Sequence, residues 1–165
     1  MDSIWGKALK SLWVLAIGVI AWVSGAVQSS ESGPEVRIDH AWVRAMPPGQ
    51  RNTAAYLAVT NRGSSPLEIV GATTDLANRA EIHVSREVDG YVRMEQLHSL
   101  ALPPGQTVQL SPGGKHLMLL GLKEMPVPGS TARLCLSFAD GQSACVDAPV
   151  QKSPAGSANH HQHHQ

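Results

Sequence analysis

The sequence has almost no excess of either charge. Its 165 residues carry 13 Lys and Arg against 13 Asp and Glu. Nucleic-acid binding normally calls for a basic face, so no nucleic-acid partner is expected. We find no Ser-His-Asp set, no phosphate-binding loop and no paired carboxylates that would suit general acid-base chemistry. The sequence therefore indicates a binding protein and not an enzyme.

Cysteine is scarce, with only Cys135 and Cys145 in the chain. They lie five residues either side of Asp140, so a three-residue hairpin loop centred there would place them opposite each other. In an oxidising compartment such a pair is expected to form a disulfide. A redox-active or metal-binding pair is the alternative, although there is no Cys-x-x-Cys motif to lower a thiol pKa. A blue-copper site is disfavoured because no His follows either cysteine before residue 160.

Long helical periodicity is missing after residue 30. Short alternating apolar stretches are instead separated by turns rich in Gly and Pro, such as Pro47-Pro48-Gly49 and Pro103-Pro104-Gly105. This pattern predicts an all-β, antiparallel sandwich or barrel over residues 35–150. Roughly 115 residues fit one domain, and we expect a monomer.

The N-terminal 26 residues have the layout of a secretory signal helix. Lys7 and Lys10 precede an uncharged apolar run, which ends in the small residues Ser24-Gly25-Ala26. Cleavage after Ala26 would leave a linker over residues 27–34 and place the domain in the periplasm. No Cys follows the cleavage site, which disfavours a lipid-attached form. The alternative is an uncleaved anchor over residues 12–27, which is short of the ~20 residues that a spanning helix needs.

Four residues could together bind a soft metal: His83, Met94, His116 and Met118. In a strand, alternate side chains share a face, so His116 and Met118 point the same way and Leu117 points to the opposite, apolar side. Asp89-Gly90 is a strong signal for a type I′ hairpin turn.

That turn would pair Ser85 with Met94. His83 would then lie diagonally across from Met94, at a backbone separation of roughly 7–8 Å. Two β-ribbons would thus each present one His and one Met.

The ligand types select the metal. Thioether sulfur is neutral and soft and favours Cu(I), which imidazole also suits; structural zinc prefers Cys and His. Taken singly, each residue is more simply a packed Met or a hydrogen-bonded His. A Cu(I) site is favoured instead, because strand alternation and the predicted hairpin turn place these side chains on matching faces. Met46 and Met125 lie in Pro-containing loops, where a packing role is favoured over that of an extra thioether ligand. His40 and His98 have no partner at ligand spacing and are expected to be structural or solvent-facing.

The ligand spacing resembles that of the periplasmic CuA chaperone family, PCuAC, with its His, ten residues, Met, twenty-one residues, His-x-Met pattern. One departure is that many members carry a Met just after the first His, where this chain has Val84 and Ser85. The likeness covers about residues 35–150. It extends to Ala41-Trp42-Val43-Arg44-Ala45, Pro47-Pro48-Gly49, Ala54-Ala55-Tyr56-Leu57, Asn61-Arg62-Gly63, Ala80-Glu81-Ile82-His83, Pro112-Gly113-Gly114 and Leu119-Leu120-Gly121-Leu122.

The resemblance implies a cupredoxin-like fold and delivery of copper to the CuA site of cytochrome c oxidase subunit II. Other periplasmic copper chaperones would be further partners. A site without thiolate or charged ligands suits a carrier, because it can release Cu(I) by stepwise exchange. Two alternatives stay open: a periplasmic copper buffer or resistance protein, and a thiol-disulfide oxidoreductase acting on the CuA cysteines.

Residues 151–165 form a tail of Ser, Pro, Ala and Gly that ends in a His-rich tract. Its composition cannot bury a core, so we expect disorder. Imidazoles without sulfur suit Cu(II), which predicts a second, looser Cu(II) site. The alternative is a solubilising tail with incidental metal affinity. The histidines concerned are His160, His161, His163 and His164.

Overall fold

The computed structural model describes residues 35–152, and all of its regular structure is β-strand. None of the described residues forms a helix long and apolar enough to cross a membrane. The predicted signal segment, the linker and the His-rich tract lie outside this range. The strands are β1 (Val36–Arg44), β2 (Asn52–Asn61), β3 (Leu67–Thr74), β4 (Ala77–Val88), β5 (Tyr91–Leu97), β6 (Leu100–Leu102), β7 (Thr107–Leu110), β8 (Lys115–Leu122), β9 (Thr131–Phe138) and β10 (Ser143–Gln151).

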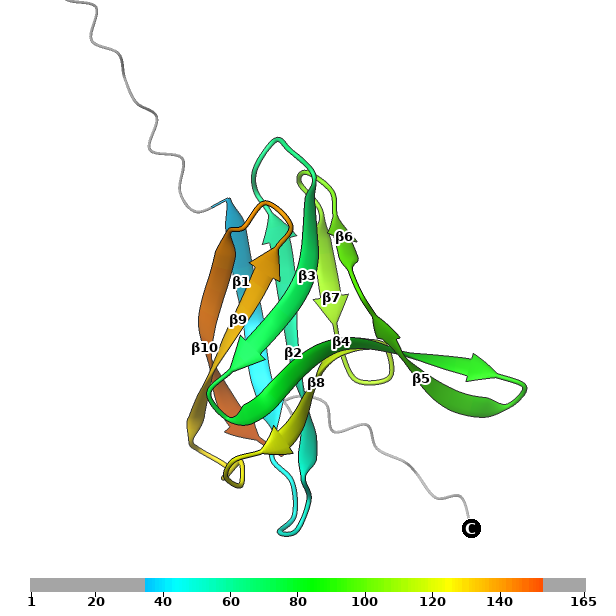
Figure 1. The fold of residues 1–165 in the computed structure, drawn as a ribbon, viewed down its shortest axis with the longest axis vertical. Coiled ribbons are helices and arrows are strands. Elements are labelled where there is room, and N and C mark those ends of the chain that lie inside the picture. The colour runs from blue at the N-terminus through cyan, green and yellow to red at the C-terminus, as the bar shows by residue number, and fades with distance from the viewer. Residues whose placement is uncertain (1–34, 153–165) are drawn as a thin grey trace, which may run out of the picture. The chain divides into compact units, whose positions relative to one another are not determined.

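Seven of these strands close into a barrel, in the order β4-β8-β2-β1-β10-β9-β3, and the pairing of Ala72 with Ala80 joins β3 back to β4 (Figure 1). β5, β6 and β7 extend the sheet from β4, β3 and β2 respectively. The all-β prediction is confirmed. One pairing departs from the antiparallel expectation, because β1 and β10 run parallel through Val43 and Val150. These two strands are not consecutive in the chain, so no hairpin dictates their direction.

The barrel interior is filled by the apolar side of each strand. In β8, Leu117 and Leu119 are fully buried in the main hydrophobic core. Because side chains alternate along a strand, their burial directs His116 and Met118 to the outer face of the barrel. Burying each leucine contributes about 1.5–3 kcal/mol. This burial strongly fixes which side chains of β8 face the core and which face outward.

A β-bulge in β1 changes which residues of β1 lie opposite those of β2. The register shifts between Asp39 and Trp42, and His40 adopts a positive φ of 53°. The extra residue places Trp42 opposite Tyr56. The structure thus has one strand, β1, interrupted by this bulge.

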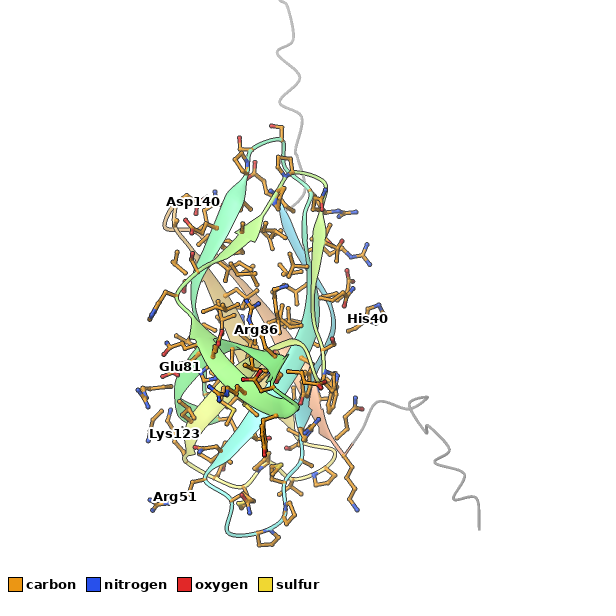
Figure 2. The ribbon with its side chains drawn as sticks, turned by 90° about the vertical axis from the view of Figure 1, so that its right-hand side faces the viewer. His40, Arg51, Glu81, Arg86, Lys123 and Asp140 are labelled. Atoms are coloured by element: carbon orange, nitrogen blue, oxygen red, sulfur yellow. A yellow bond between two sulfur atoms is a disulfide. The ribbon has the colours of Figure 1, made fainter. Side chains whose placement is uncertain are left out.

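The β4–β5 hairpin has the predicted register. Val88 pairs with Tyr91 and Ser85 pairs with Met94. Asp89 and Gly90 have φ values of 54° and 78°, as the tight turn requires. The outer half of this hairpin, hereafter the β4–β5 ribbon, projects from the barrel in Figure 1, and Figure 2 is turned by 90° so that the ribbon points towards the viewer.

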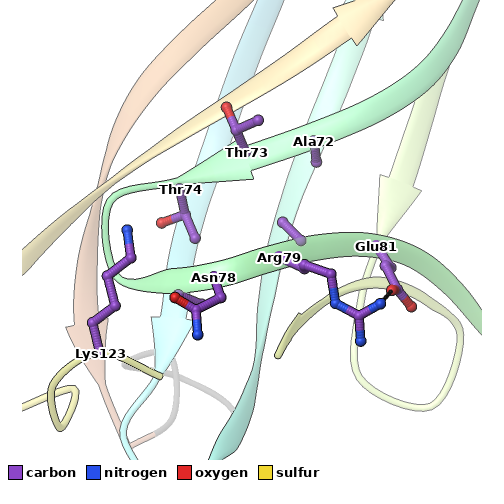
Figure 3. A pocket seen from close by; sticks show the side chains of 9 residues that line it. Ala72, Thr73, Thr74, Asn78, Arg79, Glu81 and Lys123 are labelled. Carbon is purple, nitrogen blue, oxygen red and sulfur yellow. Dashed lines mark ion pairs between the residues drawn. The ribbon is translucent and has the colours of Figure 1, made fainter. Parts of the chain in front are cut away.

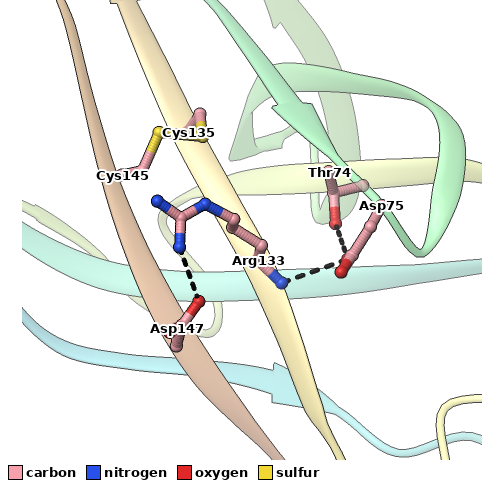
Figure 4. The surroundings of a disulfide bond; sticks show 6 residues. All are labelled: Thr74, Asp75, Arg133, Cys135, Cys145 and Asp147. Atoms are coloured by element: carbon pink, nitrogen blue, oxygen red, sulfur yellow. Dashed lines mark hydrogen bonds and ion pairs between the residues drawn. A yellow bond between two sulfur atoms is a disulfide. The ribbon is translucent and has the colours of Figure 1, made fainter.

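The two cysteines form a disulfide, in the predicted register. Cys135 pairs directly with Cys145 across β9 and β10, and their Cα atoms are 4.0 Å apart (Figure 4). Beside it, the Arg133 guanidinium donates to Asp147 at 3.2 Å. A closed disulfide rules out a metal site at these two sulfurs.

We predict that replacing both cysteines by alanine lowers the free energy of unfolding by about 2–3 kcal/mol. The bond closes a loop of 10 residues, and its loss returns conformational freedom to the unfolded chain. Urea denaturation of Cys135→Ala/Cys145→Ala measures the effect. The matched control is Ser137→Ala/Ser143→Ala, the neighbouring cross-strand pair in the same hairpin. Equal stability of the two double variants would contradict the prediction.

Candidate metal centre

The two histidines of the candidate site are direct neighbours. His83 of β4 pairs with His116 of β8, and their ring centroids lie 6.0 Å apart. The sequence predicted two separate ribbons that converge. The structure instead places both histidines in one continuous sheet, because β4 pairs with β8 along most of its length.

Hydrogen bonds select the free nitrogen of each ring. The Gly114 carbonyl can only accept, so His116 Nδ1–H donates to it at 3.0 Å and Nε2 keeps its lone pair. His83 Nε2–H donates to the Glu81 carboxylate at 3.0 Å, which leaves the lone pair on Nδ1. Metal-binding histidines are typically oriented in this way by a carbonyl or carboxylate on the second nitrogen.

The free nitrogen of His83 has no protein partner. Among the described residues, His83 Nδ1 is the buried side-chain polar atom without a hydrogen bond. An unsatisfied buried polar atom typically costs about 1–3 kcal/mol. A metal ion bound at this nitrogen would remove that cost, so the histidine pair fits a metal.

Two thioethers lie on the same outer face. Met118 is half-buried between its partners Glu81 and Ala54 on the flanking strands. Met94 lies on the edge strand β5 and is 59% exposed. By contrast, His116 is only 5% exposed. The four predicted ligands therefore span a wide range of solvent access.

Three of the four predicted residues line one hollow of about 210 Å³: Met94, His116 and Met118. We call it the methionine hollow. His83 is not on its wall and instead contacts the site from the β4 side, next to His116. The other lining residues are Arg44, Met46, Asn52, Thr53, Ala54, Tyr56, Ser85 and Gly113.

A row of aromatic rings backs the hollow. Trp42 and Tyr56 are 4.5 Å apart between centroids, and Tyr56 lies 6.4 Å from His116. The Arg44 guanidinium stacks over Tyr56 at 5.2 Å. Burial raises the pKa of the Tyr56 phenol, and the nearby Arg44 opposes this shift. The phenol is therefore neutral at physiological pH, and the rigid rings hold the inner wall in place.

The charges near the site favour a monovalent ion. Arg44 is the charged residue on the hollow wall. The carboxylate of Glu81 contacts His83 and is shared with Arg79, whose guanidinium is 3.2 Å away. Among residues 35–152, no three His, Cys, Asp or Glu side chains gather as a metal site. Zinc and hard cations prefer such donors, whereas the imidazoles and thioethers on this face suit a soft ion.

A second hollow, between β3 and β4, does not share this chemistry. It has a volume of about 380 Å³, and its polar wall includes Thr73, Arg79 and Lys123 (Figure 3). No imidazole or thioether lines it. Glu81 links it to the histidine pair, because this residue lies on its wall and bonds His83.

Sequence reasoning missed Glu81 and Tyr56 as neighbours of the site and favoured packing for Met46. Glu81 could have been found, because it lies two residues before His83 and therefore on the same strand face. His40 and His98 are exposed, as expected. Met125 is half-buried in a loop and does not line the methionine hollow. The four tail histidines lie outside the described residues.

Solved structures with this fold include copper-binding domains. The solution structure of CuI-DR1885 from Deinococcus radiodurans matches with a TM-score of 0.61 at 34% identity, covering 76% of this chain and 83% of that one. The copper-bound PCuAC domain from PmoF2 also has a TM-score of 0.61, at 24% identity, covering 73% and 95%. The second match shows the likeness of fold alone. The first match, at 34% identity, supports a copper chaperone together with the family match given below.

Sequence relatives agree with this fold match. The protein named "Putative lipoprotein Lxx21020" from Leifsonia xyli subsp. xyli (strain CTCB07) is 35% identical over 126 residues, which cover 76% of this chain and 75% of the relative. Residues 36–150, nearly the whole described domain, match the family model described as LpqE-like. The chain therefore belongs to the LpqE-like family and is a PCuAC-like protein.

Proposed function

We propose that this protein binds one Cu(I) ion through His83, Met94, His116 and Met118 and delivers it to a recipient outside the cytoplasm. The observation that carries the proposal is the unsatisfied, buried Nδ1 of His83, next to a second imidazole whose Nε2 is also free. Two thioethers flank this pair on the same face. All four donors are neutral, which suits Cu(I).

The graded exposure of the ligands suits a carrier. His116 is buried and its ring is anchored by Gly114, whereas Met94 is mostly exposed on an edge strand. An incoming ligand can therefore approach the copper from the Met94 side. Met94 would leave first and the histidines last, so the ion need never be free in solution.

The proposed recipient is the CuA site of cytochrome c oxidase subunit II, with other periplasmic copper chaperones as further partners. This assignment rests on the resemblance to the PCuAC family. A location outside the cytoplasm agrees with the disulfide and with the lipoprotein names of the family and the relative. A copper buffer would share the site but retain its cargo.

The His-rich tail is proposed as a second, looser Cu(II) site formed by His160, His161, His163 and His164. Its imidazoles without sulfur support the choice of Cu(II), and the described domain ends near the methionine hollow. Gln151 accepts a hydrogen bond from Ala45 at 2.9 Å, next to Arg44, which lines the methionine hollow. The tail therefore starts beside the Cu(I) site.

We predict that Met118→Ala weakens Cu(I) binding at least about tenfold, or ~1.4 kcal/mol, because a neutral sulfur donor is lost. Competition with a chromophoric Cu(I) chelator gives the affinity and the stoichiometry. Met125→Ala, which removes a thioether outside the hollow, is the control. Thermal melting checks that both variants fold. Unchanged affinity in Met118→Ala would count heavily against the proposed site.

A carrier should give up its copper to the right acceptor. We predict that the Cu(I)-loaded protein transfers its ion to an apo CuA domain, followed by the copper content of the two proteins after separation. Cys135→Ala/Cys145→Ala should transfer equally well, because the disulfide lies on β9 and β10, away from the hollow. Retention of copper would indicate a buffer, and loss of transfer in the cysteine variant would indicate a thiol-disulfide role.

Removing the tail separates the two copper sites. We predict that the full chain binds Cu(II) that a chain ending at Lys152 does not, while both bind Cu(I) equally. The reason is that the tail offers imidazoles alone, whereas the barrel offers the sulfurs. Calorimetric titration with Cu(II) measures the difference. Equal Cu(II) binding by the two chains would remove the tail hypothesis.

A further inference from the structure

Met46 is close to the candidate site although its sequence context suggested packing. It follows the end of β1 and precedes Pro47 in the loop to β2. Its half-buried side chain lines the methionine hollow together with Met94, His116 and Met118. Among the described methionines, only Met125 lies away from this hollow.

The backbone next to Met46 is held on two sides. The carbonyl of Arg44 accepts a hydrogen bond from the Thr53 hydroxyl at 2.6 Å. The Ala45 amide donates to Gln151 at 2.9 Å. Met46 therefore leaves a fixed point at the rim of the hollow. Methionine has three rotatable side-chain bonds and adapts readily to irregular spaces, so its sulfur can turn into the hollow.

We propose that Met46 is a third thioether ligand of the Cu(I) ion, in addition to Met94 and Met118. The inference rests on the proposed function, because it assigns a new donor to the same site. The hollow would then present three sulfurs and the imidazole of His116 to one ion. His83 would reach the same ion from the β4 side, next to His116, so the donor set would hold one more sulfur than the sequence predicted.

A third sulfur would sharpen the choice of metal. Thioethers favour Cu(I) over divalent ions, and each adds a donor without adding charge. The guanidinium of Arg44 on the same wall repels a dication more strongly than a monocation. In the strand order β5-β4-β8-β2-β1, Met94 lies on β5 and Met46 follows β1, so the two would border the hollow from opposite ends.

Packing is the competing explanation for Met46. The side chain also borders an apolar groove with Pro47, Pro48 and Pro128. A packing role would require bulk and apolarity but no sulfur. Leucine supplies both at similar volume, so Met46→Leu separates the two explanations.

The first test is NMR of protein labelled with 13C at the methionine methyl groups, titrated anaerobically with Cu(I). We expect the methyl signals of Met46, Met94 and Met118 to shift with one equivalent, while Met125 stays unchanged. Movement of Met94 and Met118 alone would overturn the Met46 assignment and leave the proposed function standing. If no methionine signal in the hollow moves, the proposed function fails as well.

The second test compares Met46→Leu with the matched control Met125→Leu. Met46→Leu should bind Cu(I) about tenfold more weakly, and copper X-ray absorption should count one sulfur fewer than in the parent protein. Met125→Leu should change neither the affinity nor the sulfur count. A Met46→Leu protein with the parental affinity and sulfur count would overturn the inference.

Discussion

The pairing of β4 with β8 is the constraint on which the site depends. It places His83 opposite His116 and Met118 opposite Glu81. The register cannot slip by one residue, because Leu117 and Leu119 would then leave the core and both site residues of β8 would enter it. Stability and site geometry are therefore specified by the same alternation of side chains.

The polar contacts around the histidines prepare them for a ligand that the protein does not itself supply. Gly114 and Glu81 each occupy one ring nitrogen and leave the other free. Aromatic rings behind His116 hold the inner wall, whereas Met94 lies on an exposed edge. A site with a fixed inner side and an open outer side can bind an ion firmly and still pass it on.

The closed barrel separates the structural and the chemical parts of the molecule. β9 and β10 carry the disulfide, which stabilises the wall opposite β8 in the strand order. The metal face lies outside the barrel, over β2, β8, β4 and the loop after β1. The sulfur chemistry of the two parts is accordingly different: cysteine cross-links one wall, and methionine lines the hollow on the other.

Local spacing determined much of this structure. The Asp89-Gly90 turn, the His116-x-Met118 parity and the cysteines centred on Asp140 were readable from the sequence, because each depends on residues within one strand or hairpin. The tertiary structure decided the contact between His83 and His116, the parallel pairing of β1 with β10, and the place of Met46 beside the hollow. These bring together strands and loops far apart in the chain, and only closure of the barrel around a shared core determines which of them become neighbours.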